Sequence, residues 1–528
     1  MRKRILLAIK NGWYLPIFEG MKGEQVFRRI ITVYNILEIF ECDKNCTIAL
    51  YGRNSMNWIA IYIACLLKGV RLLILHPNIN KLELAHILII TNTNHIFADE
   101  DLISEEIGSS LITKTIIDIE SMLVVFERND RSYFKLLAET LVSSELTCPV
   151  SLASLDSLFE EDEISSSVIT ATSGTEGYHP KWVESSTDSI SNLVKKALPM
   201  LPFSAGDIVY SKVEFAESHY LTVLIPFISQ CEFTGHTEQA VIIIENTISM
   251  EDVWKQNVAT IYSKPFLSFL FTLPLTRWLF KILALRAIKN YYGQELKSLI
   301  IYNSVVNEDI LSILVGKLPL YTTYGSQETN QLVAVNDFSS KDKRLPCAVG
   351  SVLPGISINS FEDELEISSP TLFDKYVADI SYTREVRFRD NYVTGDIGIV
   401  DTNTNVMFVY GRKSAIYHNE FKLPIQLDKL ERTIKAIPYI GEVIFLKVDQ
   451  ASSLPSGKTP KLILLVYPDI NFSEAKRIGL LRLGELMKVY HSKINVELGN
   501  SLSIDDIVIV PSSFIKTQDG KICRYFYS

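Results

Sequence analysis

The segment Ala171–Lys181 reads Ala-Thr-Ser-Gly-Thr-Glu-Gly-Tyr-His-Pro-Lys and follows a short apolar run, Ser167–Thr170. Glycines allow a positive φ, so successive backbone N–H groups can point at an anion. Hydroxyls add donors, and a lysine adds a positive charge for phosphate. The spacing differs from the nucleotide loop G-x-x-x-x-G-K-[ST], because no lysine directly follows Gly177. Taken alone, the segment fits both a phosphate-binding loop and an ordinary turn between strands.

A second group of chemically capable side chains lies in the run Tyr321–Glu328. The apolar stretch Leu318–Leu320 predicts a strand that ends in a turn at this run. The ring of Tyr324 can stack on a base, and the carboxylate of Glu328 can hold Mg²⁺.

Three charged residues follow farther along the chain. Asp396 comes just after a glycine in the run Tyr392–Asp396, where we expect a turn and a carboxylate suited to ribose hydroxyls. Arg412 follows Gly411 and supplies a guanidinium that is always charged. Lys521 follows Gly520 near the end of the chain. Each of these residues, taken singly, is also common in solvated surface loops.

The composition places these residues in a folded protein of several units. With 528 residues, of which 47% are hydrophobic and 21% charged, the chain is expected to form two to four domains or subdomains. A net charge of −9 argues against a general nucleic-acid binder, so no nucleic-acid partner is expected.

The pattern of apolar runs predicts an α/β sheet in the first part of the chain. Cys46–Tyr51 and Arg71–Leu75 are typical of buried strands, and Trp58–Lys68 and Lys81–Ile90 of helices. The polar stretch Ser151–Ser167 is interpreted as a surface connector before the glycine-rich segment.

The later part of the chain changes character. Strand and helix patterns resume in residues 208–310, and residues 345–410 show short strands separated by turns. The overall prediction is an α/β fold: a large N-terminal domain of two α/β subdomains plus a small β subdomain, followed by a small mobile α+β C-terminal domain. A small terminal domain joined by a single crossing is typical of a moving lid.

Two features bear on location. The N-terminal apolar stretch is too short for a secretion signal, and seven scattered cysteines are typical of reduced thiols, so we predict a cytoplasmic protein. Cys42 and Cys46 are the only close pair, and nothing nearby in the sequence completes a zinc site.

The hydrophobic segment Phe266–Ile288 is interrupted by Pro274 and by three basic residues, which excludes a membrane span. We interpret it as a core or substrate-lining helix. Peripheral contact with a membrane or a hydrophobic partner stays open as the alternative.

Together and in this order, the motifs resemble those of the acyl-adenylate-forming (AMP-binding) superfamily, which includes acyl- and aryl-CoA ligases, luciferase and peptide-synthetase adenylation domains. The resemblance covers nearly the whole chain and includes the segments Tyr51–Trp58 and Val349–Gly355. It implies an N-terminal domain, residues 1–411, that binds ATP and a carboxylic acid. Residues 412–528 would form the lid, with a hinge near Ser414 where the family usually has Asp or Lys.

The resemblance also implies a reaction and a set of site residues. The acid carboxylate attacks the α-phosphorus of ATP, pyrophosphate leaves and an acyl-adenylate forms, a reaction that depends on positioning and charge neutralisation. The implied ATP-binding residues are Thr172, Ser173, Gly174, Thr175, Gly177, Lys181, Tyr324, Asp396 and Arg412. Glu328 would hold Mg²⁺. Lys521 would bridge the α-phosphate and the substrate carboxylate as the catalytic lysine, and His219 would lie beside that carboxylate. The acid pocket would include Tyr302, Asn303, Ser304 and Gly325.

Several positions depart from the family pattern. Glu176 replaces a threonine in the glycine-rich segment, and an extra residue separates Gly177 from Pro180. Tyr302 stands where a pocket-wall glycine is usual, which predicts a short, bent or polar acid; the alternative is a displaced strand with Tyr302 packed in the core. Glu217 is close to where amino-acid-activating members carry an aspartate.

The segment after the hinge, Lys413–Pro424, lacks the usual lysine and glycine of the thiol tunnel and has His418 and Asn419 near those positions. We therefore expect transfer to a thiol, more readily the phosphopantetheine of a carrier protein acting in trans than free CoA. An acyl- or aryl-CoA ligase is the first alternative. A degenerate homologue that binds nucleotide or acyl ligand without turnover is the second.

Overall fold

The computed structural model describes the larger part of the chain. The described residues are 1–103, 115–127, 151–159, 165–172, 180–246, 250, 277–303, 306, 311, 314–339, 348–361, 364–377, 379–388, 391–418, 424–435, 440–448, 461–468, 504, 506–516, 522, 524 and 527.

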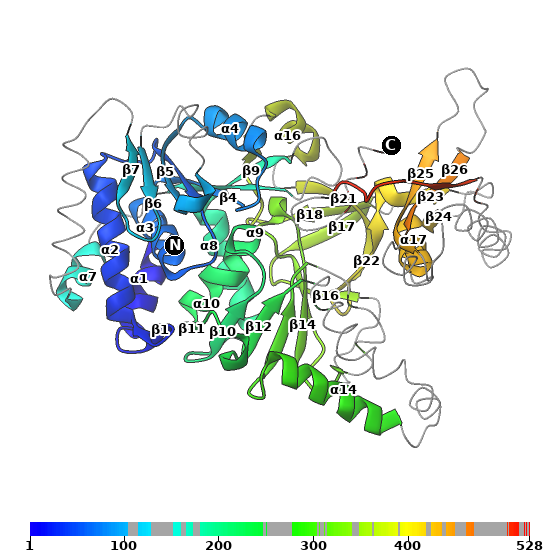
Figure 1. The fold of residues 1–528 in the computed structure, drawn as a ribbon, viewed down its shortest axis with the longest axis horizontal. Helices are drawn as coiled ribbons and strands as arrows, with labels where there is room; N and C mark the ends of the chain where they lie inside the picture. Colours follow the sequence, from blue (N-terminus) through cyan, green and yellow to red (C-terminus); the bar gives the residue numbers. More distant parts are fainter. Residues whose placement is uncertain are drawn as a thin grey trace.

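Two large sheets form the framework of the N-terminal part (Figure 1). The first sheet runs in the order β19 (Lys375–Tyr376), β9 (Trp182–Ser186), β8 (Ser167–Ala171), β4 (Arg71–Leu75), β3 (Thr47–Tyr51), β5 (Thr93–Ala98), β6 (Thr115–Asp118) and β7 (Val124–Glu127). Strands β8, β4, β3, β5 and β6 are parallel to one another, which confirms the predicted α/β pattern.

The second sheet continues without a break into the predicted small β subdomain. Its order is β17 (Ser357–Phe361), β18 (Glu364–Ser368), β21 (Asn391–Asp401), β22 (Val406–Arg412), β16 (Ala348–Val352), β15 (Ala334–Asp337), β14 (Leu320–Tyr324), β13 (Ser298–Ile301), β12 (Ile242–Glu245), β10 (Ile208–Ser211), β11 (Glu232–Phe233), β1 (Pro16–Phe18) and β2 (Met21–Lys22), with β20 (Arg387–Phe388) beside β21. The strands of residues 348–412 thus extend the α/β sheet by hydrogen bonding across β15 and β16, rather than forming a sheet of their own.

Helices and short turns of the N-terminal part cover both faces of these sheets. The helices are α1 (Arg2–Asn11), α2 (Gly23–Ile39), α3 (Met56–Lys68), α4 (Lys81–Ile90), α7 (Leu152–Phe159), α8 (Thr187–Ala197), α9 (Phe215–His219), α10 (Ile225–Ile228), α14 (Arg277–Tyr292) and α16 (Ile380–Val386). The shorter turns are η1 (Glu100–Leu102), η2 (Leu198–Met200), η3 (Tyr220–Leu224, a π-helical turn), η4 (Thr237–Gln239), η6 (Gln327–Thr329) and η7 (Lys413–Ala415).

Alternate side chains along the central strands face different cores, and this shows how the layers are stacked. In β3, Ile48 and Leu50 belong to the large core shared with α1–α3 and α8–α10, whereas Ala49 and Tyr51 face α4. In β12, Ile243 belongs to a separate core with residues of α14. The order of layers is therefore α4, first sheet, central helices, second sheet and α14, and Figure 1 shows α4 and α14 at opposite ends of the molecule.

Helix α4 has the predicted bounds, whereas α3 ends as predicted at Lys68 but begins at Met56, two residues earlier than predicted; each begins after a capping residue. Ser55 Oγ accepts a hydrogen bond of 3.1 Å from Trp58 N at the start of α3. Asn80 Oδ1 accepts one of 2.8 Å from Leu82 N at the start of α4. Such caps satisfy backbone donors that the first turn of a helix leaves unpaired.

The two sheets are joined where β19 pairs with β9, because the chain leaves the second sheet after β18 and adds a strand to the first. Glu184 in β9 stabilises this junction. Its carboxylate accepts hydrogen bonds from Arg71 Nε at 2.9 Å, Arg71 Nη2 at 2.6 Å and Ser167 Oγ at 2.6 Å, and it lies 3.5 Å from Lys375 Nζ. One buried carboxylate therefore links β4, β8, β9 and β19.

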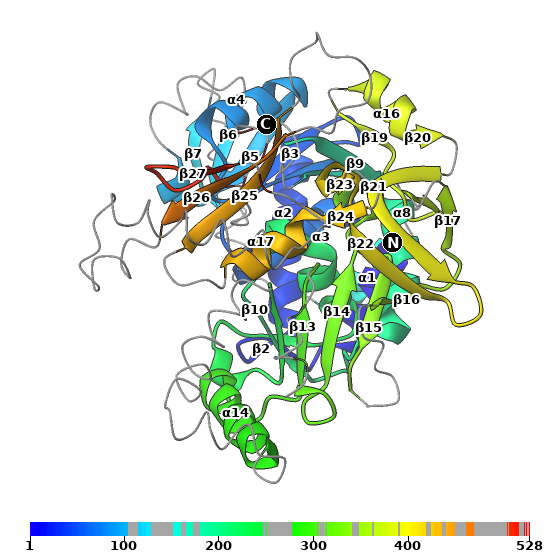
Figure 2. The same cartoon turned by 90° about the vertical axis from the view of Figure 1, so that its right-hand side faces the viewer.

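The C-terminal part has its own core and lies beside β17–β22, away from α1 and α2 (Figures 1 and 2). It contains the hairpin β23 (Ile416–His418) and β24 (Pro424–Gln426), helix α17 (Leu427–Lys435), and a sheet of β25 (Ile440–Val448), β26 (Lys461–Pro468) and β27 (Asp506–Ile509). Leu427, Phe445 and Leu464 are among its buried residues. The predicted α+β composition is confirmed.

Three local predictions were wrong. Residues 152–159 form helix α7, in which Leu155 and Leu158 are buried, so this part of Ser151–Ser167 is not a plain connector. Strand β14 continues through Tyr324 instead of ending before Tyr321, because it pairs with β15 up to Ala334. Asp396 lies within the long strand β21 rather than after a turn.

Within the described residues, no helix has the length and apolar character needed to span a membrane. Helix α14 covers the second half of Phe266–Ile288, and its Ile288 is buried against the second sheet, as expected for a core helix. Residues 266–276 lie outside the described residues.

Replacing Glu184 with glutamine tests the junction between the sheets. Burial acts to raise the pKa of Glu184, but hydrogen bonds from Arg71 and Ser167 and the nearby positive charges outweigh it, so the pKa is lowered. We expect E184Q to reduce the free energy of unfolding at pH 7 by about 2–3 kcal/mol, less than for a fully buried pair because Arg71 keeps some solvent contact.

The pH dependence of stability tests the direction of this effect. A carboxylate with a lowered folded-state pKa stabilises the protein above its unfolded pKa, and this stabilisation is lost as the pH falls through the folded pKa. Between pH 7 and pH 4, the free energy of unfolding measured with urea should therefore fall less for E184Q than for the wild type. The control is E24Q, which changes a surface pair with Arg28. Equal stability losses for E184Q and E24Q would contradict the role of Glu184.

Candidate active site

The predicted phosphate-binding segment connects two antiparallel strands. Thr172 N donates to Lys181 O at 2.8 Å, and Lys181 N donates to Thr172 Oγ1 at 3.0 Å, so the two ends of the loop are held together. Ser173, Gly174, Thr175 and Gly177, together with Glu176, lie outside the described residues. The loop therefore begins at the end of β8, on the edge of the first sheet where the parallel strands end.

Lys181 extends toward β19 and helix α16. Its Nζ lies 3.7 Å from the centre of the Tyr382 ring and 5.7 Å from that of Tyr376. A lysine over aromatic faces gains a cation–π attraction while its charge stays accessible. The stacking directs this charge across the junction between the sheets.

Glu328 lies on the other side of the same aromatic pair. It is buried in η6, and its Oε1 accepts a hydrogen bond of 2.7 Å from the Tyr376 hydroxyl. Burial, and then the Glu328 charge, raise the pKa of Tyr376, so this hydroxyl stays protonated and donates. Tyr376 thus orients one carboxylate oxygen and leaves the other side of the carboxylate for a hard cation.

Tyr324, Asp396 and Arg412 meet although they come from three different strands. The Tyr324 hydroxyl donates to Asp396 Oδ2, and Arg412 Nε donates to Asp396 Oδ1 at 2.9 Å. Arg412 Nη1 also donates to Thr394 O at 3.1 Å. Burial, followed by the Asp396 charge, raises the pKa of Tyr324 and keeps it a donor. The aspartate is thereby fixed between two donors.

Gly395 explains how Asp396 can take this position inside a strand. Its φ of +74° is a conformation that other residues rarely adopt. Asp396 is opposite Arg412 in the β21–β22 pairing, and the register shifts one pair further on, between Ile397 and Gly398.

The predicted acid-pocket residues also lie together. Asn303 N donates to Thr323 Oγ1 at 3.0 Å, and Asn303 Oδ1 accepts from Gly325 N at 3.2 Å, which connects the ends of β13 and β14. A Cβ on Gly325 would lie 2.3 Å from the backbone of Gln331, so only glycine fits. Ser304 lies outside the described residues.

Tyr302 crosses from the end of β13 to helix α9. Its hydroxyl lies 3.4 Å from Glu217 O, and its ring packs against the large core. The Glu217 side chain turns toward the first sheet, where its Oε1 lies 3.3 Å from Nε2 of His76 at the end of β4.

His219 differs from the other residues of the site in its surroundings. It is fully buried in α9, with its ring 5.4 Å from the Tyr62 ring, and neither ring nitrogen has a hydrogen-bond partner among the described residues. Burial lowers its pKa to about 3. At neutral pH the imidazole is therefore uncharged, and it can act on a carboxylate only as a neutral hydrogen-bond donor.

The sequence reasoning missed three residues that organise the site. Gln327 Oε1 accepts from Thr170 Oγ1 at 3.0 Å and from Gln331 Nε2 at 2.9 Å, which connects β8 to η6. Tyr376 and Tyr382 support Glu328 and Lys181. Gln327 stands inside the run Tyr321–Glu328 and could have been noticed, whereas neither tyrosine belongs to a motif.

The predicted catalytic lysine and hinge lie in the C-terminal part. Lys521 is outside the described residues, although residues 516 and 522 on either side of its loop are paired. At the hinge, Lys413 Nζ binds Glu364 of the N-terminal part at 2.6 Å, while Lys447 Nζ of β25 donates to Ser414 O at 2.6 Å. The side-chain contacts thus change from one domain to the other between Lys413 and Ser414.

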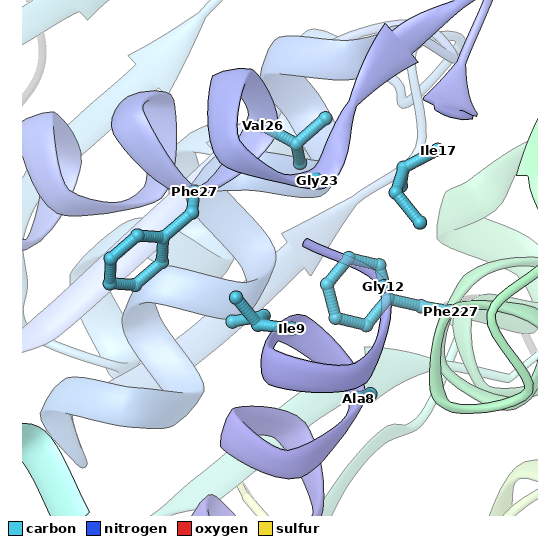
Figure 3. A pocket seen from close by; sticks show the side chains of 8 residues that line it. All are labelled: Ala8, Ile9, Gly12, Ile17, Gly23, Val26, Phe27 and Phe227. Atoms are coloured by element: carbon cyan, nitrogen blue, oxygen red, sulfur yellow. The ribbon is translucent and has the colours of Figure 1, made fainter. Parts of the chain in front are cut away.

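A small apolar pocket between α1, β1, α2 and α10 is not part of this site. Ile9, Ile17, Phe27 and Phe227 line it (Figure 3), and its cavity volume is about 10 Å³. That volume holds one water molecule at most, so the pocket is too small for an organic acid.

Comparison with known proteins assigns the class of this site. Residues 24–370 match the family described as AMP-binding enzyme. The fold is that of an adenylate-forming enzyme. Because the match covers more than half of the chain, the chain belongs to the AMP-binding enzyme family. No curated protein sequence matches the chain significantly.

Solved structures confirm the fold over the whole chain. ATP-bound MatB from Rhodopseudomonas palustris has a TM-score of 0.70 at 14% identity, covering 100% of this chain and 98% of its own. O-succinylbenzoate coenzyme A synthetase (MenE) from Bacillus subtilis, in complex with ATP and magnesium, has a TM-score of 0.69 at 14% identity, covering 99% and 98%. The anthranilate CoA ligase AuaEII, in complex with anthranoyl-AMP, has a TM-score of 0.70 at 12% identity, covering 99% and 96%.

Removing the Tyr376 hydroxyl tests its support of Glu328. We expect Y376F to raise the Mg²⁺ concentration needed for half-maximal ATP–pyrophosphate exchange about 10- to 100-fold, because partners that orient a metal ligand have effects of this size. The matched control is Y382F, which keeps the ring beneath Lys181. Identical Mg²⁺ dependence of the two variants would show that the Tyr376 hydroxyl does not position the carboxylate.

Proposed function

We propose that this enzyme activates a carboxylic acid with ATP and transfers the acyl group to a thiol, preferentially the phosphopantetheine of a carrier protein acting in trans. The observation that carries the adenylation step is the Tyr324–Asp396–Arg412 group, together with the buried and oriented carboxylate of Glu328. In the first step, an acid oxygen forms a bond to the α-phosphorus and the bond to pyrophosphate breaks. In the second, the thiol sulfur attacks the acyl carbon, AMP leaves and the thiol proton is lost.

Each group has a defined task in this proposal. The loop Thr172–Lys181 binds the β- and γ-phosphates, and Asp396 and Arg412 bind the ribose beside the Tyr324 ring. Glu328 fits a magnesium ligand, because it is a buried, oriented carboxylate, and bound Mg²⁺ would neutralise phosphate charge. Neutral His219 and the Tyr302–Gly325 region would contact the acid.

The position of Tyr302 supports a short or polar acid. Its ring spans from β13 to α9 and occupies the wall where a glycine would leave space for a longer chain. The Glu217–His76 pair adds polar groups on the neighbouring side.

The contacts around Ser414 support a hinge at this residue. Lys413 is held by the N-terminal part and Ser414 by the C-terminal part, so a rotation between them would keep these two contacts while opening the η7 hydrogen bond from Ile416 N to Lys413 O. A lid made of residues 412–528 would then carry Lys521 to the α-phosphate for adenylation and remove it afterwards.

Lys521→Ala tests the catalytic role of the lysine. We expect ATP–pyrophosphate exchange, measured with a panel of aliphatic, aryl and amino acids, to fall at least about 100-fold in kcat, because one charge aimed at the transition state is removed. ATP affinity should change far less. The control is K317A, an exposed lysine outside the site. Absence of exchange with every acid, together with an unaffected K521A, would refute the enzyme proposal and favour a homologue that only binds ligand.

The acceptor thiol requires a separate test. The structural relatives named above are CoA ligases, which makes free CoA the second candidate acceptor. We expect a higher kcat/KM for a phosphopantetheinylated carrier protein than for CoA, measured as thioester product with the acid that supports exchange. Equal values for the two acceptors would contradict the carrier preference without affecting the adenylation step.

A further inference from the structure

A cluster of metal-binding side chains lies in the first sheet, apart from the ATP site. Cys42, Cys46 and His95 are all at least nine-tenths buried. One potential ligand atom from each lies within 4.8 Å of the other two. The two sulfurs are 3.1 Å apart, and both residues are in the thiol form.

Two tight turns place the cysteine pair. After α2 ends, Glu41 has a positive φ, and Cys42 N donates to Leu37 O at 2.9 Å, which fixes the direction in which the chain leaves the helix. Cys46 N then donates to Asp43 O at 3.0 Å, immediately before β3. The two thiols are therefore held on one side of a defined loop.

His95 comes from β5 and could not be connected with the cysteines from the sequence. It is opposite Ile48 in the β3–β5 pairing, so it lies near the start of β3, close to Cys46. Its ring stacks on Phe40 with centroids 4.7 Å apart, and its Nδ1 hydrogen-bonds to the Thr115 hydroxyl. Outer partners of this kind orient the imidazole of metal-binding histidines. His95 thus supplies a third candidate ligand that the sequence around the two cysteines does not contain.

We propose that Cys42, Cys46 and His95 bind a thiophilic metal ion, Zn²⁺ or Cu⁺, with a water or an open position completing the coordination. Two thiolates and an imidazole are ligands that these ions prefer, whereas Mg²⁺ and Ca²⁺ require oxygen ligands. Two Zn–S bonds of about 2.3 Å at a tetrahedral angle place the sulfurs about 3.8 Å apart. Binding thus requires the thiols to separate by less than 1 Å from their present 3.1 Å.

The cluster lies away from the proposed ATP site, so this proposal does not depend on the proposed function. Cys46 precedes β3, whereas the phosphate-binding loop follows the end of β8, a strand parallel to β4 and so to β3. The cluster and the ATP site therefore lie at opposite edges of the sheet. A bound metal would connect the end of α2 to β3 and β5.

Metal analysis of the full-length protein tests the site directly. The untagged wild type is expressed with zinc, dialysed without chelator, and analysed for zinc and copper by inductively coupled plasma mass spectrometry. We expect about one ion per chain. Cobalt(II) substitution should give a thiolate-to-metal charge-transfer band. C42S and C46S should fall below about one tenth of an ion per chain, while C231S, which changes a buried cysteine outside the cluster, should keep it.

The wild-type measurements keep the proposal falsifiable if a variant fails to fold. Less than about one tenth of an ion per chain in folded wild type after zinc or copper(I) reconstitution would overturn it. An intact mass showing a Cys42–Cys46 disulfide in freshly purified protein would overturn it as well. Retention of the ion by folded C42S and C46S would assign the metal to another site and equally reject the cluster.

Discussion

The pairing of β19 with β9 is the constraint on which the site depends. Without this pairing, the hairpin that carries the phosphate-binding loop would contact only the first sheet. Glu328, Tyr324 and Asp396 would then be connected only to the second sheet. Because the strand that follows β18 adds to the first sheet, Tyr376 donates to Glu328, and the adjacent Tyr382 ring lies under Lys181. Glu184 then forms ion pairs with both Arg71 and Lys375 at the junction.

Polar side chains at the site are preorganised largely by one another. Asp396 is fixed by Tyr324 and Arg412, Glu328 by Tyr376, and the η6 turn by the contact of Gln327 with Thr170. Such prior orientation matters in phosphoryl transfer, where catalysis consists of positioning and charge stabilisation rather than covalent chemistry. His219 contrasts with these groups, because its burial leaves it neutral and without a partner among the described residues.

Local signals predicted the elements whose ends are set by their own residues. Helices α3 and α4 were placed well because Ser55 and Asn80 cap them, and β4 because its apolar run is bounded by polar residues. The errors arose where partners decide the structure. Strand β14 runs on through Tyr324 because β15 pairs with it, and Asp396 stays inside β21 because Gly395 accommodates a positive φ there.

The sequence by itself determined the family, through the order of motifs from Thr172 to Lys521, and it named most of the residues expected to bind ATP. It could do so because each motif is a short run whose residue types suit one task. Only the tertiary structure decided which side chains meet across strands: Tyr376 with Glu328, Tyr382 with Lys181, and His95 with the cysteine pair. These contacts depend on strand order and register, which no local spacing encodes, and for that reason the sequence offered no third ligand beside Cys42 and Cys46.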